Sequence, residues 1–297
     1  MNQDSVNAWI FLNEDEPSGT NYKSRDSSYQ RLIDKDVYQS VDILYLCFAT
    51  ILKTSDKTVP SGKGDTYTVE IGASDHPGGM TNFDYMRLIT QDARKVNPDI
   101  QLSLTLGYGN GALISQIFTN SQKTPEEAAE AFAKNMVSYL KKYNLNGFDL
   151  DWEYPISSDT SQDQFKLIIN AIGTEFEKEQ KKYYLTISPA VADNLDADAI
   201  NEYVDFINLQ LYSGFTIPFE FTRIGINSDL FAYGAKFEGI SPPDNKGYQT
   251  AEEAYKDNNE KYHYSRFTNW RLNSSNFVFE QDQQQQLYKL VNMQPVP

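Results

Sequence analysis

The sequence is short of the residue types on which several kinds of catalytic site depend. Its 297 residues include one cysteine, Cys47, and two histidines, His76 and His263. A single cysteine excludes a disulfide within the chain, and its place in the apolar run VDILYLCFA indicates a buried side chain. Two histidines argue against a histidine-rich zinc site and against a Ser-His-Asp or Cys-His catalytic machine. We therefore expect no metal and no cofactor, and we expect both histidines to have packing or surface roles.

Cationic residues and long apolar runs are also scarce. Lys and Arg number 26 against 41 Asp and Glu, which gives a net charge of -15. This charge repels the phosphates of nucleic acid and the anionic face of a membrane, so we expect neither as a partner and favour a neutral substrate. No run approaches 18 consecutive apolar residues, which argues against a membrane-spanning helix. The opening stretch MNQDSVNAWIFLNEDEP lacks the features of a secretory leader.

Strand-like and helix-like segments alternate along the whole chain. The predicted strands cover residues 5–12, 41–49, 100–107, 147–152, 183–190, 204–213, 229–237 and 264–272. The predicted helices cover residues 83–96, 125–143, 164–176, 196–203, 250–259 and 282–291. Eight strands with helices between them predict an α/β fold, a single (β/α)8 TIM barrel that spans residues 1–297 as one catalytic domain.

Two connections between the predicted strands differ in length. Residues 55–82, rich in Gly, Ser, Asp and Pro, are predicted to form a long loop after the second strand. Residues 238–263, between the last two strands, are too few for a large α+β insertion domain. We therefore expect a barrel without such an insertion.

The segment NGFDLDWEYP, residues 146–155, places three acids at alternate positions, Asp149, Asp151 and Glu153. A period of two is typical of a β-strand, so the three carboxylates share one face and the apolar residues between them share the other. In a parallel barrel the active site lies at the carboxyl ends of the strands, which places Glu153 at the mouth. Like charges in a poorly solvated site raise one another's pKa, and this predicts a protonated Glu153 that can act as a general acid.

Two other interpretations of these acids stay open at this point. They could form the solvated face of an antiparallel strand, which is a common place for an alternating pattern. They could also bind a divalent cation, because carboxylates attract hard cations, although the segment lacks the D-x-D-x-D-G spacing of a calcium loop.

The same segment resembles the signature of glycoside hydrolase family 18, the chitinases and their relatives. That signature reads D-G-x-D-x-D-x-E and often continues as W-E-Y-P. The chain matches it at Gly147, Asp149, Asp151 and Glu153, and it has Asn146 where the family usually has Asp. Asn146 keeps a hydrogen-bonding side chain, so we expect its effect on local structure rather than on chemistry.

Three further segments extend the resemblance over most of the predicted barrel. LTISPA (185–190), INLQLYS (207–213) and FTNWRLNSS (267–275) are similar to the fifth, sixth and eighth strands of the family. At the third strand the chain has TLGY (105–108) where the family has S-x-G-G.

The resemblance implies substrate-assisted, retaining hydrolysis of the β-1,4 linkages between N-acetylglucosamine units. Glu153 would be the general acid and base, and Asp151 would orient the acetamide N–H of the sugar. Asp149 would share a proton with Asp151 from below, and Tyr212 would hydrogen-bond the attacking acetamido oxygen.

The resemblance also implies a set of substrate-binding residues. Gln210 would lie beside Tyr212, and Trp270 would form the floor of the sugar site, because a flat indole supports the apolar face of a pyranose ring. Tyr108, Phe215 and Phe219 follow strand ends and are predicted to form additional subsites.

Three functions are compatible with these residues. The first is a chitinase that acts on chitin or chitooligosaccharides, and the closest alternative is an endo-β-N-acetylglucosaminidase that acts on N-glycans. A non-catalytic chitinase-like lectin is the alternative from another class, although such proteins commonly lose the acid that is present here as Glu153. Because chitin is too large to enter a cell, we expect a secreted or extracellular protein, with possible assembly into a larger secreted complex.

Overall fold

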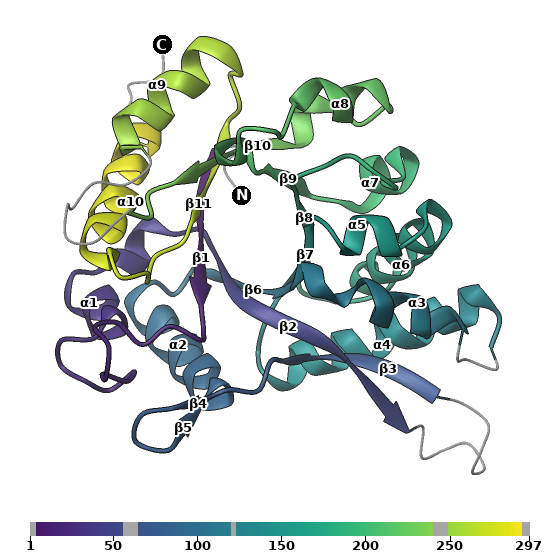
Figure 1. The fold of residues 1–297 in the computed structure, drawn as a ribbon, viewed down its shortest axis with the longest axis horizontal. Coiled ribbons are helices and arrows are strands. Elements are labelled where there is room, and N and C mark those ends of the chain that lie inside the picture. Colours follow the sequence, from purple (N-terminus) through teal and green to yellow (C-terminus); the bar gives the residue numbers. More distant parts are fainter. Residues whose placement is uncertain (1–3, 56–64, 120–122, 240–248, 293–297) are drawn as a thin grey trace.

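The computed structural model describes residues 4–55, 65–119, 123–239 and 249–292, and eight parallel strands in these ranges close into a barrel (Figure 1). In their order around the barrel, the strands are β1 (Ser5–Phe11), β2 (Ile43–Ser55), β6 (Gln101–Leu106), β7 (Gly147–Trp152), β8 (Tyr184–Pro189), β9 (Phe206–Leu209), β10 (Phe231–Lys236) and β11 (Arg266–Trp270). Strand β11 pairs with β1, so the sheet has no open edge among these eight strands. The predicted (β/α)8 barrel is therefore confirmed.

Helices surround the barrel on its outside (Figure 1). They are α1 (Ser28–Asp34), α2 (Asn82–Val96), α3 (Gly111–Thr119), α4 (Pro125–Lys142), α5 (Ile156–Asp159), α6 (Gln162–Glu177), α7 (Ala197–Tyr203), α8 (Pro218–Arg223), α9 (Ala251–Lys261) and α10 (Phe277–Asn292). Helix α4 begins with a capping box, in which the Thr124 and Glu127 side chains bond to each other's backbone N–H groups. Over the described ranges, no helix is long and apolar enough to cross a membrane.

The prediction of one long loop over residues 55–82 is wrong in part. Strand β3 (Asp65–Ile71) pairs antiparallel with the end of β2, which extends beyond the barrel (Figure 1). Its side chains Tyr67, Val69 and Ile71 are buried, and the Asn135 amide of α4 donates to the Tyr67 carbonyl. Residues 65–71 alternate between polar and apolar side chains, but the polar residues on both sides of them favoured the prediction of a loop. Two short strands, β4 (Asp75–His76) and β5 (Met80–Thr81), follow it, and residues 56–64 lie outside the described ranges.

Other predicted boundaries shift where the strands meet the loops. The sixth barrel strand, predicted over 204–213, ends at Leu209, and a 3-10 turn η3 (Leu211–Ser213) follows it. The final helix begins at Phe277 rather than at residue 282. Helices α1, α3 and α8 were not predicted, because each is only six to nine residues long and offers little periodic signal.

The side chains of β7 alternate between two faces, as the period of two in the sequence predicts. Phe148, Leu150 and Trp152 are buried in the cluster between the strands and the helices, where the Trp152 ring meets Phe165 with centroids 4.7 Å apart. The opposite face points into the barrel. There the interior is unusually polar for a packed core, and its buried polar side chains are Asn7, Thr105, Asp149, Thr186, Ser188, Asn208 and Thr268.

Asn146, the departure from the family motif, lies before β7 at the end of the barrel away from the mouth. Its Oδ1 accepts a hydrogen bond from the Leu102 backbone N–H at 3.0 Å. Asp42 does the same before β2, where its Oδ2 accepts from the Val6 N–H at 2.7 Å. Asn and Asp both supply this acceptor, so the substitution keeps the bond that joins neighbouring strands.

Helix α10 carries a buried acid, Glu280, that lies outside the predicted site. It is fully buried, and Ser274 donates to it both from its backbone N–H, at 3.0 Å, and from its hydroxyl. Burial raises the pKa of Glu280 to about 7, and the hydrogen bonds from Ser274 oppose that rise.

We predict that Glu280→Gln makes the protein more stable than the wild type above pH 7. A raised pKa means that Glu280 contributes stability below pH 4.5, its value in the unfolded chain, and loses that contribution as the pH rises through about 7. A glutamine does not titrate, so the difference in unfolding free energy should grow over this window to about 3 kcal/mol. Chemical denaturation at pH 4.5 and pH 8 measures it. Glu202→Gln, at an exposed position, is the control, and a difference that is independent of pH would contradict the prediction.

Candidate active site

The lowest acid of the site, Asp149, lies at the centre of a hydroxyl cage. Its residue pairs in register with Thr186 on β8, and Asp151 pairs with Ser188, so two hydroxyls face the two carboxylates. Thr186 Oγ1 donates to Asp149 Oδ1 at 2.6 Å, and Ser188 Oγ donates to the same oxygen at 2.9 Å. Asp149 is completely buried. The cage replaces the water that this carboxylate would lose on burial.

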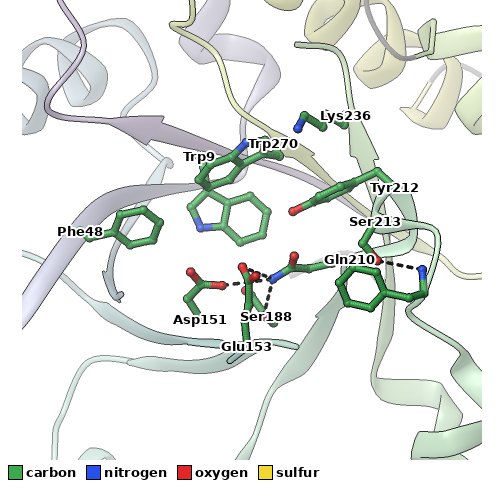
Figure 2. Close-up of a pocket in the computed structure, with 11 residues that line it drawn as sticks. Trp9, Phe48, Asp151, Glu153, Ser188, Gln210, Tyr212, Ser213, Lys236 and Trp270 are labelled. Atoms are coloured by element: carbon green, nitrogen blue, oxygen red, sulfur yellow. Dashed lines mark hydrogen bonds between the residues drawn. The ribbon is translucent and has the colours of Figure 1, made fainter. Parts of the chain in front are cut away.

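Gln210, which follows β9, holds the upper two acids together. Its Nε2 lies 3.1 Å from Asp151 Oδ1, 3.1 Å from Glu153 Oε1 and 3.0 Å from the carbonyl oxygen of Ser188 (Figure 2). Two amide hydrogens serve these three acceptors, so the amide fixes both carboxylates relative to β8. The family resemblance implied only that Gln210 lies beside Tyr212, and the structure shows that its amide bonds the acids.

Burial and neighbouring charges raise the pKa values of Asp149 and Asp151. Burial raises the pKa of Asp149 to about 6, against the opposing effect of the hydroxyls. Burial first, and then the negative charge of Glu153 and a hydrogen bond to it, raise the pKa of Asp151 well above its ordinary value. Burial therefore disfavours the charged form of Asp151. The protonation of Glu153 that the sequence suggested stays a prediction.

Tyr212 lies on the turn η3, directly above the acids. Burial, followed by the charges of Asp151 and Glu153, raises the pKa of its phenol well above the ordinary value. The phenol consequently stays protonated, and its O–H is available as a donor toward the pocket.

An aromatic group supports Trp270 from below. The rings of Trp9 and Trp270 lie 5.9 Å apart, and Phe48 is stacked on Trp270 at 6.1 Å. Trp9 in turn stacks on Tyr45 at 4.8 Å, and the guanidinium of Arg271 lies 6.0 Å from the Trp270 ring. Trp270 is thus held as a fixed platform rather than as a mobile side chain.

The acids and the platform enclose a pocket of about 440 Å³, a size suited to a small ligand. Its lining residues are Trp9, Phe48, Asp151, Glu153, Ser188, Gln210, Tyr212, Ser213, Phe215, Lys236 and Trp270. The pocket therefore brings together most of the residues singled out in the sequence, with Asp149 beneath them. Tyr108 and Phe219 are exposed and do not line it, and their use as additional subsites stays a prediction.

Sequence reasoning missed five residues of the pocket, Trp9, Phe48, Ser188, Ser213 and Lys236. Ser188 could have been predicted, because it lies two residues after Thr186 on β8 and therefore points into the barrel on the strand next to the acids. Trp9, Phe48 and Lys236 lie near the ends of predicted strands, but only barrel closure brings those three ends together.

The histidine and the cysteine that the structure shows in detail have packing roles, as expected. His76 is buried and stacks on Tyr85 with centroids 3.8 Å apart, and its ring nitrogens face Asp15 and Asn82. Cys47 is fully buried in the barrel. In the part of the chain that the structure describes, no group of three or more His, Cys, Asp or Glu side chains is placed to hold a metal ion.

The closed barrel carries its acids and Trp270 at one mouth, which is an arrangement that glycoside hydrolases use. The family model described as "Glycosyl hydrolases family 18" matches residues 19–270. The chain belongs to this family.

Curated relatives match this chain over part of its length. An endochitinase of Brugia malayi is 37% identical over 102 residues, which are 33% of this chain and 19% of the relative. Chitinase A1 of Niallia circulans is 32% identical over 135 residues, or 40% of this chain and 19% of the relative. The chain thus aligns with about a fifth of each of these two relatives.

Solved structures show the same fold over nearly the whole chain. A mutant class V chitinase from Nicotiana tobaccum, solved in complex with NAG4, has a TM-score of 0.62 at 14% identity, and the match covers 96% of this chain and 99% of that one. A chitinase-like agglutinin from Robinia pseudoacacia has a TM-score of 0.62 at 15% identity, with 95% and 99% covered. At these identities the likeness establishes the fold and leaves the activity to the site.

We predict that removing the hydroxyl cage raises the pKa of Asp149. In the double variant Thr186→Val with Ser188→Ala, the carboxylate loses the donors that stabilise its charged form. The pKa should rise from about 6 by roughly one unit or more. A pH titration of the aspartate side-chain carbons by NMR measures it, with the signal assigned by its loss in Asp149→Asn.

The matched control for this titration is Thr90→Val, which removes a buried hydroxyl on α2 that bonds the Met86 carbonyl. The pKa of Asp149 should stay at about 6 in this variant. An unchanged or lowered pKa in the double variant would show that the cage does not stabilise the carboxylate.

Proposed function

We propose that this protein is a chitinase that hydrolyses β-1,4 linkages between N-acetylglucosamine units with retention of configuration. The observation that carries the proposal is the bonding of the upper acids. Asp151, whose pKa burial raises, is linked to Glu153 through Gln210, and Tyr212 and Trp270 line the same pocket. One acid stands at the mouth, where a glycosidic oxygen would lie, and the second is fixed beneath the sugar.

In the first step, the acetamido oxygen of the bound sugar attacks its own anomeric carbon. Glu153 donates its proton to the departing glycosidic oxygen as the bond to that oxygen breaks. The nucleophile arrives with the substrate at high effective concentration, so the site needs no second carboxylate nucleophile. The phenol O–H of Tyr212 donates a hydrogen bond to the acetamido oxygen and holds it near the carbon that it attacks.

In the second step, water opens the cyclic oxazolinium ion. Glu153, now a carboxylate, takes a proton from this water as the oxygen bonds to the anomeric carbon. Asp151 orients the acetamide N–H and stabilises the positive charge that develops on the ring, while Asp149 shares its proton from below. Two displacements at one carbon restore the original β configuration.

The choice of substrate rests on the platform and on the relatives. Trp270 offers a flat apolar surface to the face of a pyranose ring, and relatives of this chain carry the name chitinase. A class V chitinase with the same fold was solved in complex with NAG4. Secretion and the extent of the single catalytic domain over 1–297 stay part of the proposal.

A lectin function is the rival from another class, because the same fold occurs in a chitinase-like agglutinin. The presence of Glu153 at the mouth, bonded to Gln210, favours catalysis. Action on N-glycans uses the same acids. Comparing release from soluble chitin oligomers with release from glycoproteins separates those two substrates.

We predict that Glu153→Gln lowers kcat on a chitin oligomer by on the order of a thousandfold while binding of the oligomer is kept. The amide preserves the shape of the side chain but removes the proton that the leaving oxygen requires. Initial rates and calorimetric binding measure the two effects. Glu220→Gln, on α8 outside this pocket, is the matched control and should keep the wild-type rate.

Two results would contradict this proposal in different ways. Full activity in Glu153→Gln would refute the mechanism but leave the function standing. A wild-type protein that binds the oligomer without any turnover would instead support the lectin function.

A further inference from the structure

Arg271 joins three loops at the mouth of the barrel. It directly follows β11, which lies between β1 and β10 in the sheet. Its Nη1 donates at 2.6 Å to Glu14, in the loop after β1, and its Nη2 donates at 2.9 Å to Glu238, in the loop after β10. The Arg271 side chain is 13% exposed, and those of Glu14 and Glu238 are 24% and 20% exposed. Both ion pairs are therefore largely shielded from solvent and salt.

The guanidinium of Arg271 also lies against two aromatic rings. Its central carbon is 5.3 Å from the centroid of Phe11 and 6.0 Å from that of Trp270. The Phe11 ring meets Phe48 edge-on at 5.6 Å, and Phe48 in turn stacks on Trp270 at 6.1 Å. These four side chains form a closed ring of contacts. The ion pairs fix the guanidinium, and the guanidinium contacts the indole.

The chemistry of arginine suits this position. A guanidinium is planar and carries several N–H donors, so it bonds two carboxylates along its edges while its face lies on an aromatic ring. The ammonium of a lysine is a compact charge without a flat face. Arg271 therefore restricts Trp270 in a way that positive charge alone does not.

We propose that Arg271 is a positioning residue, which holds the indole of Trp270 in one orientation before a sugar arrives. The consequence for substrate rests on the proposed chitinase function, whereas the effect on Trp270 does not. Without Arg271 the indole must be ordered during binding, and this loss of freedom reduces affinity. A bound sugar then holds the ring itself, so the rate at saturation changes little.

The first test measures the order of Trp270 without any ligand. In 15N-labelled protein, the indole N–H signals of Trp9, Trp152 and Trp270 are separate from the backbone, and the Trp270 signal is assigned by its loss in Trp270→Phe. We expect an order parameter of about 0.85 in the wild type, and in Arg271→Met either a value below about 0.6 or exchange broadening. Trp152, which packs against Phe165 outside the barrel, should keep its signal in both proteins.

The second test measures hydrolysis of a chitin oligomer. Arg271→Met should raise KM about tenfold and change kcat less than about threefold. Arg271→Lys keeps the charge but cannot bridge both carboxylates, so it should resemble Arg271→Met rather than the wild type. Arg266→Met is the matched control, because it removes an arginine that lies over Phe206 at the opposite end of β11. It should leave KM and the Trp270 signal unchanged.

A milder variant carries the test if Arg271→Met does not fold. Glu14→Gln keeps the size of the side chain and weakens one of the two ion pairs. It should lower the order parameter of Trp270 and raise KM, by less than Arg271→Met does. Combined with a folded Arg271→Met it should add nothing, because both changes act through the same bond.

An unchanged Trp270 signal in Glu14→Gln, or in a folded Arg271→Met, would overturn the inference. A wild-type KM and order parameter in Arg271→Lys would overturn it too, since charge alone would then suffice. So would a large fall in kcat at an unchanged KM. A wild type without turnover would refute the proposed function instead, and the order parameter would still decide the role of Arg271.

Discussion

The cost of burying two acids, Asp149 and Asp151, on the strand that leads to Glu153 governs the structure of this site. Moving a carboxylate out of water costs several kcal/mol unless other groups replace its hydration. The barrel provides those groups in order of depth: hydroxyls around Asp149, and then the Gln210 amide between Asp151 and Glu153. Solvation of the acids decreases with depth, and only Glu153 reaches the mouth. In the proposed chemistry, this difference in depth separates the proton donor, Glu153, from the charge stabiliser, Asp151.

The other residues of the pocket lie around these acids and include Tyr212 and Trp270. In the proposed chemistry the substrate carries its own nucleophile, so the site needs no second carboxylate to attack the sugar. In this proposal Tyr212 and Trp270 position the sugar, and neither forms or breaks a bond. Stacking of Trp9 and Phe48 beneath Trp270 makes the platform rigid before substrate arrives, which reduces the entropy lost on binding.

Local periodicity was sufficient to predict the barrel and the acids. The period of two on residues 147–152 assigns each side chain to a face, and this holds whatever lies next to the strand. Contacts between strands far apart in the sequence could not be predicted from local periodicity. Trp9 and Lys236 lie beside Trp270 only because β11 pairs with both β1 and β10. Strand β3 was missed for a related reason, because its partner is the end of a strand that extends beyond the barrel.

The anomeric configuration of the first product tests the proposed chemistry most directly. Proton NMR during the first minutes of chitin-oligomer hydrolysis distinguishes the two anomers of the new reducing end before they interconvert. Attack by the acetamido oxygen followed by attack of water predicts that the β anomer forms first. Initial formation of the α anomer would mean a single displacement by water, and it would contradict the roles assigned to Asp151 and Tyr212.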